Sequence, residues 1–316
     1  MRDVLERQQV WIYFVSVALG VLTAFAVSGT EGLEAAINPA LAFMLFVTFL
    51  QVPIADIGKG FGETRFLAAL MTSNFLAIPV LCFLLVGLTA DDAMLRLGIF
   101  IVLLTPCIDY VITFAHLARA DARLLLSATP ILLLVQMALL PLYLAIFLGD
   151  DAAGLVQIGP FFHAFVWLIA VPLLLAATVQ FWASRHDMGE KINGYLGLLP
   201  VPATAVVLFL VVAATVPVLG AAAGHALSAL PVYVAFAVLA PLAGFAVSKL
   251  FGLAPQSAGA VSFSSATRNS LVVLPLALAV PGAIPVLPAV IVTQTMVELI
   301  AELIYIRIIP RLVGTR

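Results

Sequence analysis

The chain has 316 residues, of which 64% are hydrophobic and only 9% are charged, and its mean hydropathy is +1.21. Soluble domains carry about a quarter charged residues, so this composition excludes a soluble globular protein. The net charge of −2, without any cluster of basic residues, argues against nucleic acid as a partner. Because helices satisfy their own backbone in lipid, we expect an all-α polytopic membrane protein in contact with the bilayer.

Apolar runs separated by charged or Gly/Pro-rich breaks predict ten transmembrane helices along the chain. The first ten residues mix basic and acidic side chains, which favours a cytoplasmic lead-in over a cleaved signal peptide. The ten ranges are approximately 9–28, 37–55, 66–89, 94–117, 123–148, 158–182, 199–220, 230–250, 257–280 and 284–308.

The distribution of basic residues supports this count. With ten crossings and both termini cytoplasmic, the Lys and Arg residues divide 12 to 1 between the two sides, and Arg268 falls within a span. The single basic residue on the outer side is Arg96. We therefore predict a multi-pass protein of a bacterial inner membrane. The twelve cytoplasmic residues are Arg2, Arg7, Lys59, Arg65, Arg119, Arg123, Arg185, Lys191, Lys249, Arg307, Arg311 and Arg316.

The count of ten also predicts the internal organisation of a single transmembrane domain, 1–316. Two repeats of five helices, about 1–150 and 151–316, must have opposite orientations because five is odd. Inverted repeats of this kind are typical of alternating-access carriers. The longest hydrophilic connection is Ala183 to Gly194, between the sixth and seventh spans.

A polar break interrupts the fourth span at Thr105 to Tyr110, which reads T-P-C-I-D-Y. Pro106 removes one backbone hydrogen bond and disfavours helix at the preceding residue, so backbone groups are freed within the membrane. Cys107 and Asp109 follow directly. A proline kink with a packed cysteine is the simpler interpretation, but a buried carboxylate needs a partner or a proton.

The ninth span carries a second polar break at Ser264 to Ser270, S-S-A-T-R-N-S. Small hydroxylic residues such as Ser265 permit close helix packing, which is the alternative to a functional role. Close packing does not explain Arg268, whose guanidinium cannot lose its proton and needs an anion or other acceptors in the membrane. We therefore predict a substrate site that includes Cys107, Asp109, Arg268, Asn269 and Ser265.

The tenth span places Gln294, Glu298 and Glu302 at intervals of four, on one face of a helix. Glu302 lies near the cytoplasmic end, where we expect it to reach toward the membrane surface. Asp109, Glu298 and Gln294 are candidates for ion coupling, since one carboxylate remains after Arg268 is paired. In the third span, Thr72, Ser73 and Asn74 are expected to form interhelical hydrogen bonds, and Cys82 to pack.

Several function classes are excluded or disfavoured by what the sequence lacks. There is no G-x-x-x-x-G-K-[ST] phosphate loop, so an ATP-driven pump is not supported. No metal-ligand cluster and no nucleophile–base pair indicates an enzyme, and no cofactor is expected. A channel or a structural subunit would gain nothing from Asp109 and Arg268. The predicted function is therefore secondary active transport.

These features resemble the bile acid/arsenite/riboflavin transporter superfamily across essentially the whole chain. The residues that carry the resemblance are I-N-P-A-L-A-F-M-L-F in the second span, T-P-C-I-D-Y-V-I-T-F-A-H-L-A-R-A-D from Thr105, and the polar crossover of the ninth span. The resemblance implies ten helices with discontinuous, crossed fourth and ninth spans. The Pro-Cys pair and the basic-acidic turn after it are similar to the arsenite permease branch.

That branch implies proton-coupled export of trivalent arsenite, with Cys107 as the required cysteine and Glu298 as a glutamate of the tenth span. As a hypothesis, Cys107 would be a transient arsenite ligand. With only two cysteines, Cys82 and Cys107, a tight three-thiol site is excluded. The substrate could also be neutral arsenous acid, hydrogen-bonded by Asn269 and the serines.

The sequence departs from both branches at the crossover. Arg268 and Asn269 stand where the sodium-coupled bile acid branch has Glu and Gln, so a fixed guanidinium could fill the electrostatic role of a sodium ion and pair with Asp109. The alternative function is a sodium- or proton-coupled symporter of an organic anion, with Arg268 as the anion clamp. The partners are thus a small-molecule or metalloid substrate and protons, or sodium, as coupling ion.

Overall fold

The computed structural model describes residues 2–51, 63–89, 91–108, 110–149, 163, 166–217 and 222–315. Within these ranges every regular element is a helix, including one 3-10 helix (η1) and two π-helical segments (η3 and η4). The helices are α1 (Arg2–Ala26), η1 (Thr30–Leu33), α2 (Glu34–Phe49), α4 (Thr64–Thr72), η3 (Ser73–Ala77), α5 (Ile78–Val86), α6 (Ala93–Leu103), α7 (Tyr110–Leu117), α8 (Ala122–Leu148), η4 (Val166–Ala170), α11 (Val171–Ala183), α12 (Asp187–Leu196), α13 (Pro200–Thr215), α14 (Ala223–Leu250), α15 (Pro255–Ala266), α16 (Ser270–Leu278) and α17 (Val286–Val313).

The structure confirms an all-helical membrane protein. Five described stretches are helical, apolar and long enough to cross a bilayer on their own, namely α1 from Gln8, the continuous α4–η3–α5 stretch, α8, α14 and α17. The α12–α13 pair, bent by 41°, makes a sixth if it is taken as one span. Three shorter apolar helices are α2, α6 and α11. Each of the ten predicted ranges contains helix, and the fourth and ninth contain two helices separated by a break.

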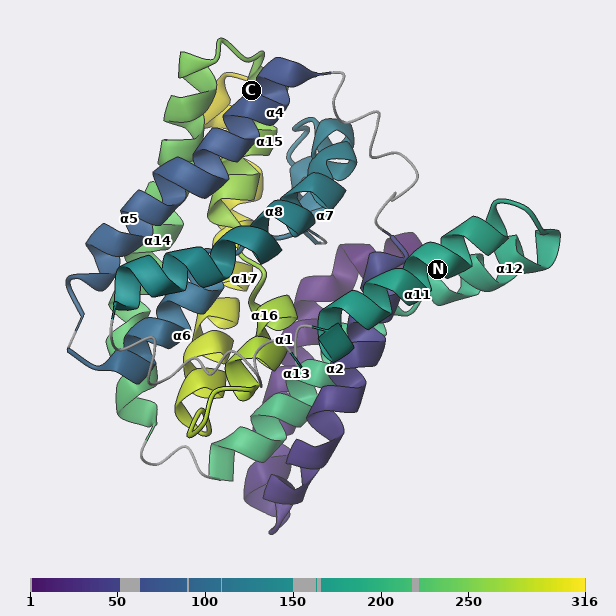
Figure 1. The fold of residues 1–316 in the computed structure, drawn as a ribbon, viewed down its shortest axis with the longest axis vertical. Helices are drawn as coiled ribbons and strands as arrows, with labels where there is room; N and C mark the ends of the chain where they lie inside the picture. Colours follow the sequence, from purple (N-terminus) through teal and green to yellow (C-terminus); the bar gives the residue numbers. More distant parts are fainter. Residues whose placement is uncertain are drawn as a thin grey trace.

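The helices form two groups that lie side by side (Figure 1). In the smaller group, α1 and α2 pack against α13, and α11 packs against α2. In the larger group, α14 packs along α15 and α17, while α17 also contacts α6 and α16. The short helices α6, α7, α15 and α16 come together inside the larger group, so the polar breaks of the chain lie away from lipid.

The hydrophilic connection between the predicted sixth and seventh spans contains a helix that we did not expect. α12 spans most of Ala183 to Gly194 and projects beside α11 at the edge of the molecule (Figure 1). Its first turn carries Asp187 and Glu190, whose negative charges favour the N-terminal end of a helix. Composition identified this stretch as hydrophilic, but local charge placement makes it helical.

The contact between α14 and α15 depends on a glycine. A Cβ built on Gly244 would lie 2.5 Å from Ser265 Oγ and 2.9 Å from the Cα of Ser262, closer than real Cβ atoms approach. The two helices therefore meet backbone to backbone, as small residues allow in membrane bundles. This close contact holds the end of α15, and with it the polar break, against α14.

We predict that Gly244→Ala destabilises the protein by about 1–3 kcal/mol, because the added methyl group forces α14 and α15 apart. The unfolding temperature of the purified protein in detergent measures the effect. Gly224→Ala is the matched control on the same helix, since no atom lies within 4 Å of its added Cβ. Equal unfolding temperatures for the two variants would contradict the close contact.

Candidate functional site

The two polar breaks predicted from the sequence meet in the larger group. α6 ends before α7 begins, and α15 ends before α16 begins, so both breaks expose backbone groups. The Cys107 N–H donates to the Thr267 carbonyl at 3.0 Å, and the Asn269 N–H donates to the Thr105 carbonyl at 2.8 Å. An antiparallel bridge centred on Pro106 lies between these bonds. Each break thus supplies the hydrogen-bond partners that the other lacks.

The Arg268 guanidinium lies within this crossing and is fully buried. Its Nη2 donates to Asn74 Oδ1 at 2.9 Å and to the carbonyl of Ser264, and its Nη1 donates to the Leu103 carbonyl at 3.3 Å. The Phe236 ring centroid lies 5.6 Å from the guanidinium carbon. Every one of these groups is neutral, so the arginine is held by protein dipoles and an aromatic face.

Helix ends supply the negative potential that this cation needs. Leu103 is the last residue of α6, and Ser264 lies in the last turn of α15, so the carbonyls of two helix C-termini point at the guanidinium. Among the described residues no carboxylate forms an ion pair with Arg268. Asp109, the acid expected to pair with it, lies outside the described residues, and that pairing stays a prediction.

The π-helical segment η3 positions the amide that contacts Arg268. Asn74 donates from Nδ2 to the Leu70 carbonyl at 3.1 Å and to Ser264 Oγ at 3.0 Å, which leaves its Oδ1 directed at the guanidinium. Beside it, the hydroxyls of Ser73 and Ser265 are 2.6 Å apart. The interhelical hydrogen bonds expected of this part of the third span are confirmed for Ser73 and Asn74.

Glu298 of α17 lies against the crossing and is 3% exposed. Its Oε2 accepts the backbone N–H of Arg268 at 2.7 Å and the Gln294 Nε2–H at 2.6 Å, and its Oε1 contacts the Tyr110 hydroxyl. The Tyr110 hydroxyl also lies 3.2 Å from the Arg268 carbonyl. The Arg268 backbone N–H can only donate, and together with the Gln294 amide it favours an ionised carboxylate here.

The expectation that Glu302 reaches the membrane surface is wrong. Its side chain is fully buried, and Oε1 is in hydrogen-bond contact with the Thr267 hydroxyl. Position along the span did not reveal this, because the rotation of α17 directs Glu302 inward, one turn below Glu298, rather than toward the surface. The crossing is thus bordered by two acids from one helix face.

The structure brings most of the predicted site residues into one region. Cys107 is buried in the crossing and Ser265 closes the contact between α15 and η3, while Gln294 supports Glu298. Asn269 contributes its backbone N–H, and its buried Nδ2 has no partner among the described residues. Cys82, expected only to pack, has its sulfur 3.7 Å from the Leu103 carbonyl that also accepts from Arg268.

Sequence reasoning missed the roles of Asn74, Tyr110 and Thr267. A polar triplet inside the apolar third span marked Asn74 as a hydrogen-bonding residue but did not reveal its partner. Tyr110 belongs to the T-P-C-I-D-Y motif, yet its link to Glu298 depends on how α7 and α17 pack. Thr267 stood within a serine-rich run, where nothing distinguished it from its neighbours.

A polar cavity of about 30 Å³ lies between the two helix groups. Most of its described lining residues carry a hydroxyl or amide group, and none of them carries a charge. Tyr110 connects this cavity to the acids, because it lines the cavity while its hydroxyl contacts Glu298. The lining residues are Gln9, Tyr13, Thr48, Gln51, Tyr110, Thr113, Pro200, Val201 and Thr204.

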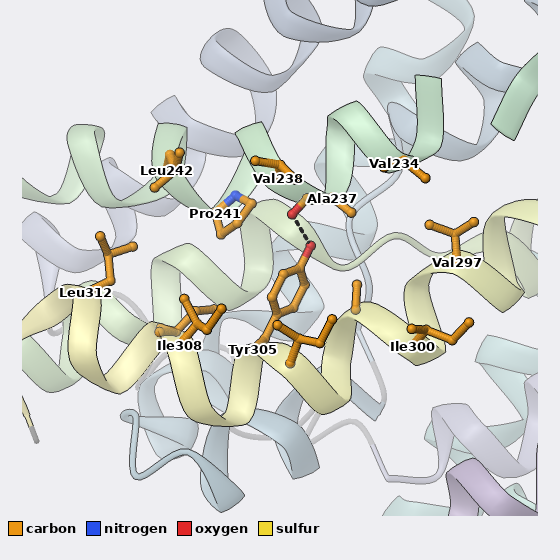
Figure 2. Close-up of a pocket in the computed structure, with 13 residues that line it drawn as sticks. Val234, Ala237, Val238, Pro241, Leu242, Val297, Ile300, Tyr305, Ile308 and Leu312 are labelled. Carbon is orange, nitrogen blue, oxygen red and sulfur yellow. Dashed lines mark hydrogen bonds between the residues drawn. The ribbon is translucent and has the colours of Figure 1, made fainter. Parts of the chain in front are cut away.

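A larger groove of about 350 Å³ between α14 and α17 has a different character (Figure 2). Aliphatic side chains such as Val238, Ile300 and Ile308 line it and are about half exposed, as expected for a surface in contact with lipid. At its base the Tyr305 hydroxyl donates to the Ala237 carbonyl (Figure 2). Its lining offers no charge to a polar solute, so we place the candidate site at the crossing.

We predict that Arg268→Ala destabilises the protein by about 2–5 kcal/mol, because three buried acceptors lose a charged donor. Arg268→Lys should be intermediate, since one ammonium group cannot reproduce the guanidinium fork. Unfolding temperatures in detergent measure both. Arg96→Ala is the control: its partly exposed ion pair with Asp91 at 2.6 Å is worth about 0–1 kcal/mol. An Arg268→Ala variant as stable as Arg96→Ala would contradict this assignment.

The sequence matches the model of the sodium bile acid symporter family over residues 38–222, more than half of the chain. A comparison with curated proteins finds no match. Members of the matched family are membrane transporters that move a small molecule together with a coupling ion, which agrees with buried charges at crossed, broken helices. The chain therefore belongs to the sodium bile acid symporter family.

Proposed function

We propose that this protein is a secondary active transporter that carries a small organic anion across the membrane and is driven by protons. Family membership and the helical membrane fold support the transport of a small molecule with a coupling ion. The observation that carries the proposal for the ion is Arg268, a permanent cation buried at the crossing of two broken helices.

The architecture that fits this function is ten spans in two inverted repeats, about 1–150 and 151–316. In each half a broken pair, α6–α7 or α15–α16, is followed by a long helix, α8 or α17. The antiparallel bridge between the two breaks is what opposite orientations would produce. The basic residues support a bacterial inner membrane with both termini cytoplasmic.

Arg268 can replace a coupling sodium ion at this position. A sodium ion needs several oxygen ligands, and the guanidinium already occupies three: Asn74 Oδ1 and the carbonyls of Leu103 and Ser264. A charge that is part of the chain cannot dissociate during the cycle. The ion that binds and leaves must therefore act elsewhere, and the carboxyls beside the crossing, Glu298 and the predicted Asp109, are suited to protons.

Tyr110 provides the connection that coupling requires. It lines the polar cavity between the helix groups, and its hydroxyl contacts the Glu298 carboxyl. A solute that displaces Tyr110 would change the hydrogen bonds of Glu298, and a change of charge at Glu298 would change the cavity wall. The guanidinium is buried and donates its hydrogen bonds to groups of the protein. Its role in this proposal is therefore to supply a fixed positive charge at the crossing, and not to bind the substrate directly.

We predict that uptake of the bile acid taurocholate into proteoliposomes responds to an imposed proton gradient and not to a sodium gradient, because the cation at the crossing is built in. Radiolabelled taurocholate uptake under each gradient measures this. Arg268→Ala should lose uptake, whereas Arg96→Ala should retain it. Wild-type uptake that demands sodium, or normal uptake by Arg268→Ala, would refute the coupling assignment.

A second candidate function is efflux of arsenite, favoured by the position of the two thiols. Cys107 is buried within the crossing, and the Cys82 sulfur contacts the carbonyl of Leu103 at its edge. Trivalent arsenic binds thiols, and capture by a single thiolate would permit release. Cys107 is the candidate transient ligand in this function, with protons again as the driving ion.

For this second function we expect everted vesicles to accumulate arsenite under a proton gradient and Cys107→Ser to abolish the accumulation. Cys82→Ser is the matched control, because its thiol lies at the edge of the crossing and should be dispensable. Accumulation by Cys107→Ser at the wild-type rate would rule out the thiol-dependent mechanism. Taurocholate uptake without arsenite transport would rule out arsenite efflux and support organic anion transport.

A further inference from the structure

Glu302 is the buried acid that the proposed function has not used. Its side chain is fully buried in α17, and Oε2 has no hydrogen-bond partner among the described residues. Oε1 has one contact, the hydroxyl of Thr267. An ionised carboxylate held by at most one hydroxyl inside a membrane protein would cost several kcal/mol, so its charge state requires an explanation.

The protons available to this contact can be counted. The Thr267 hydroxyl has one proton and lies 2.8 Å from the Phe263 carbonyl, which can only accept. When that proton is donated to Phe263, the Thr267 oxygen can only accept from Glu302. Thr267 can therefore form hydrogen bonds to both Phe263 and Glu302 when the Glu302 carboxyl is protonated and donates its own proton to the Thr267 oxygen.

Glu298, four residues earlier on the same helix face, has more hydrogen-bond donors around it. Its Oε2 accepts two N–H groups, from the Arg268 backbone and the Gln294 side chain, and the backbone N–H can only donate. No N–H group among the described residues donates to Glu302. Two carboxylates one turn apart would repel each other, so a charged Glu298 favours a neutral Glu302.

The other ionisable groups around Glu302 do not compensate for a negative charge there. Tyr305 on α17 donates to the Ala237 carbonyl and faces the α14 side. Arg268, beside Thr267 in the crossing, directs its guanidinium to acceptors from α6, η3 and α15. On α14, packed along α17, the charged residues lie near the ends: His225 is 3.1 Å from Asp92, and Lys249 lies over the Phe245 ring.

We propose that Glu302 carries a proton in this conformation and is a further carboxyl, besides Glu298 and the predicted Asp109, from which a coupling proton leaves. The second part rests on the proton-driven function proposed above. When the proton departs to water, the Thr267 hydroxyl turns from the Phe263 carbonyl and donates to the Glu302 carboxylate. The Phe263 carbonyl still accepts the backbone N–H of Thr267 at 2.9 Å, so it loses one of the two hydrogen bonds that it accepts from Thr267.

Thr267 transmits this change to the crossing. It is the residue that follows α15, with an extended backbone (φ −97°, ψ 126°), and its carbonyl accepts the Cys107 N–H at 3.0 Å. One residue therefore contacts the proton-carrying acid through its hydroxyl and the opposite broken segment through its carbonyl. Protonation of Glu302 stabilises the crossing seen here, and deprotonation loosens the end of α15.

Infrared spectroscopy of the purified protein tests the charge state without any substrate. We expect wild type and Glu298→Gln to show a deuterium-sensitive carbonyl stretch of a protonated carboxyl that is missing in Glu302→Gln. Glutamine has the shape of a neutral glutamate and can donate to Thr267, so this variant should fold. A band that persists in Glu302→Gln and disappears in Glu298→Gln would overturn the assignment, as would a wild type without the band.

A matched pair at position 267 tests the contact itself. Thr267→Val keeps the shape but removes the acceptor, so the Glu302 band should move to higher frequency as its hydrogen bond is lost. Thr267→Ser retains the hydroxyl and should leave the band in place. A band whose frequency is the same in Thr267→Val and in wild type would show that the protonated carboxyl is not the one in contact with Thr267.

Transport then tests the coupling role. In proteoliposomes, Glu302→Gln should exchange taurocholate across the membrane but fail to accumulate it under a proton gradient. Accumulation equal to wild type would overturn the coupling role of Glu302. If the wild-type protein does not accumulate taurocholate under a proton gradient, the proton-driven function and this role of Glu302 are both wrong. The infrared band would still decide whether Glu302 carries a proton.

Discussion

The structure depends on the crossing of two broken helices, because it makes a helix break tolerable within a membrane. Each break frees backbone groups that lipid cannot satisfy, and the two extended segments satisfy one another through the bonds of Cys107 and Asn269. The carbonyls left at the ends of α6 and α15 would still repel each other. The positive charge of the Arg268 guanidinium offsets this negative potential, and its hydrogen bonds join both helix ends to Asn74 of the third span.

The same cation explains why acids gather beside the crossing. Glu298 accepts a hydrogen bond from the backbone N–H of Arg268, so its carboxylate lies near a residue with a permanent positive charge. The carboxylate also accepts a hydrogen bond from the Gln294 amide. Glu302, one turn away, has no such donor among the described residues and is better accommodated as a neutral group. Different hydrogen-bond partners would give these two acids of one helix different charge states, which is the usual basis of separate roles for paired carboxyls.

Transport requires that these internal contacts respond to a solute in the space between the helix groups. Tyr110 begins α7 at the edge of the crossing, lines the polar cavity and contacts Glu298. The smaller group, built around α1, α2 and α13, provides the opposite wall of this cavity. Movement of one group against the other would open the cavity to one side. The apolar groove between α14 and α17 is suited to lipid on the outer face of this unit.

The sequence by itself determined the membrane class, the approximate position of the helices and the two polar breaks, because hydropathy and buried charge act locally along the chain. It identified Arg268, Cys107 and Glu298 for the same reason: a charge or a proline break in an apolar run is costly wherever it lies. It failed for Glu302, whose inward direction depends on the rotation of α17, and for the partners of Asn74, Tyr110 and Thr267. Only the tertiary structure decided those contacts, because they join residues that are between 35 and 194 positions apart, and no local pattern records which helix faces meet.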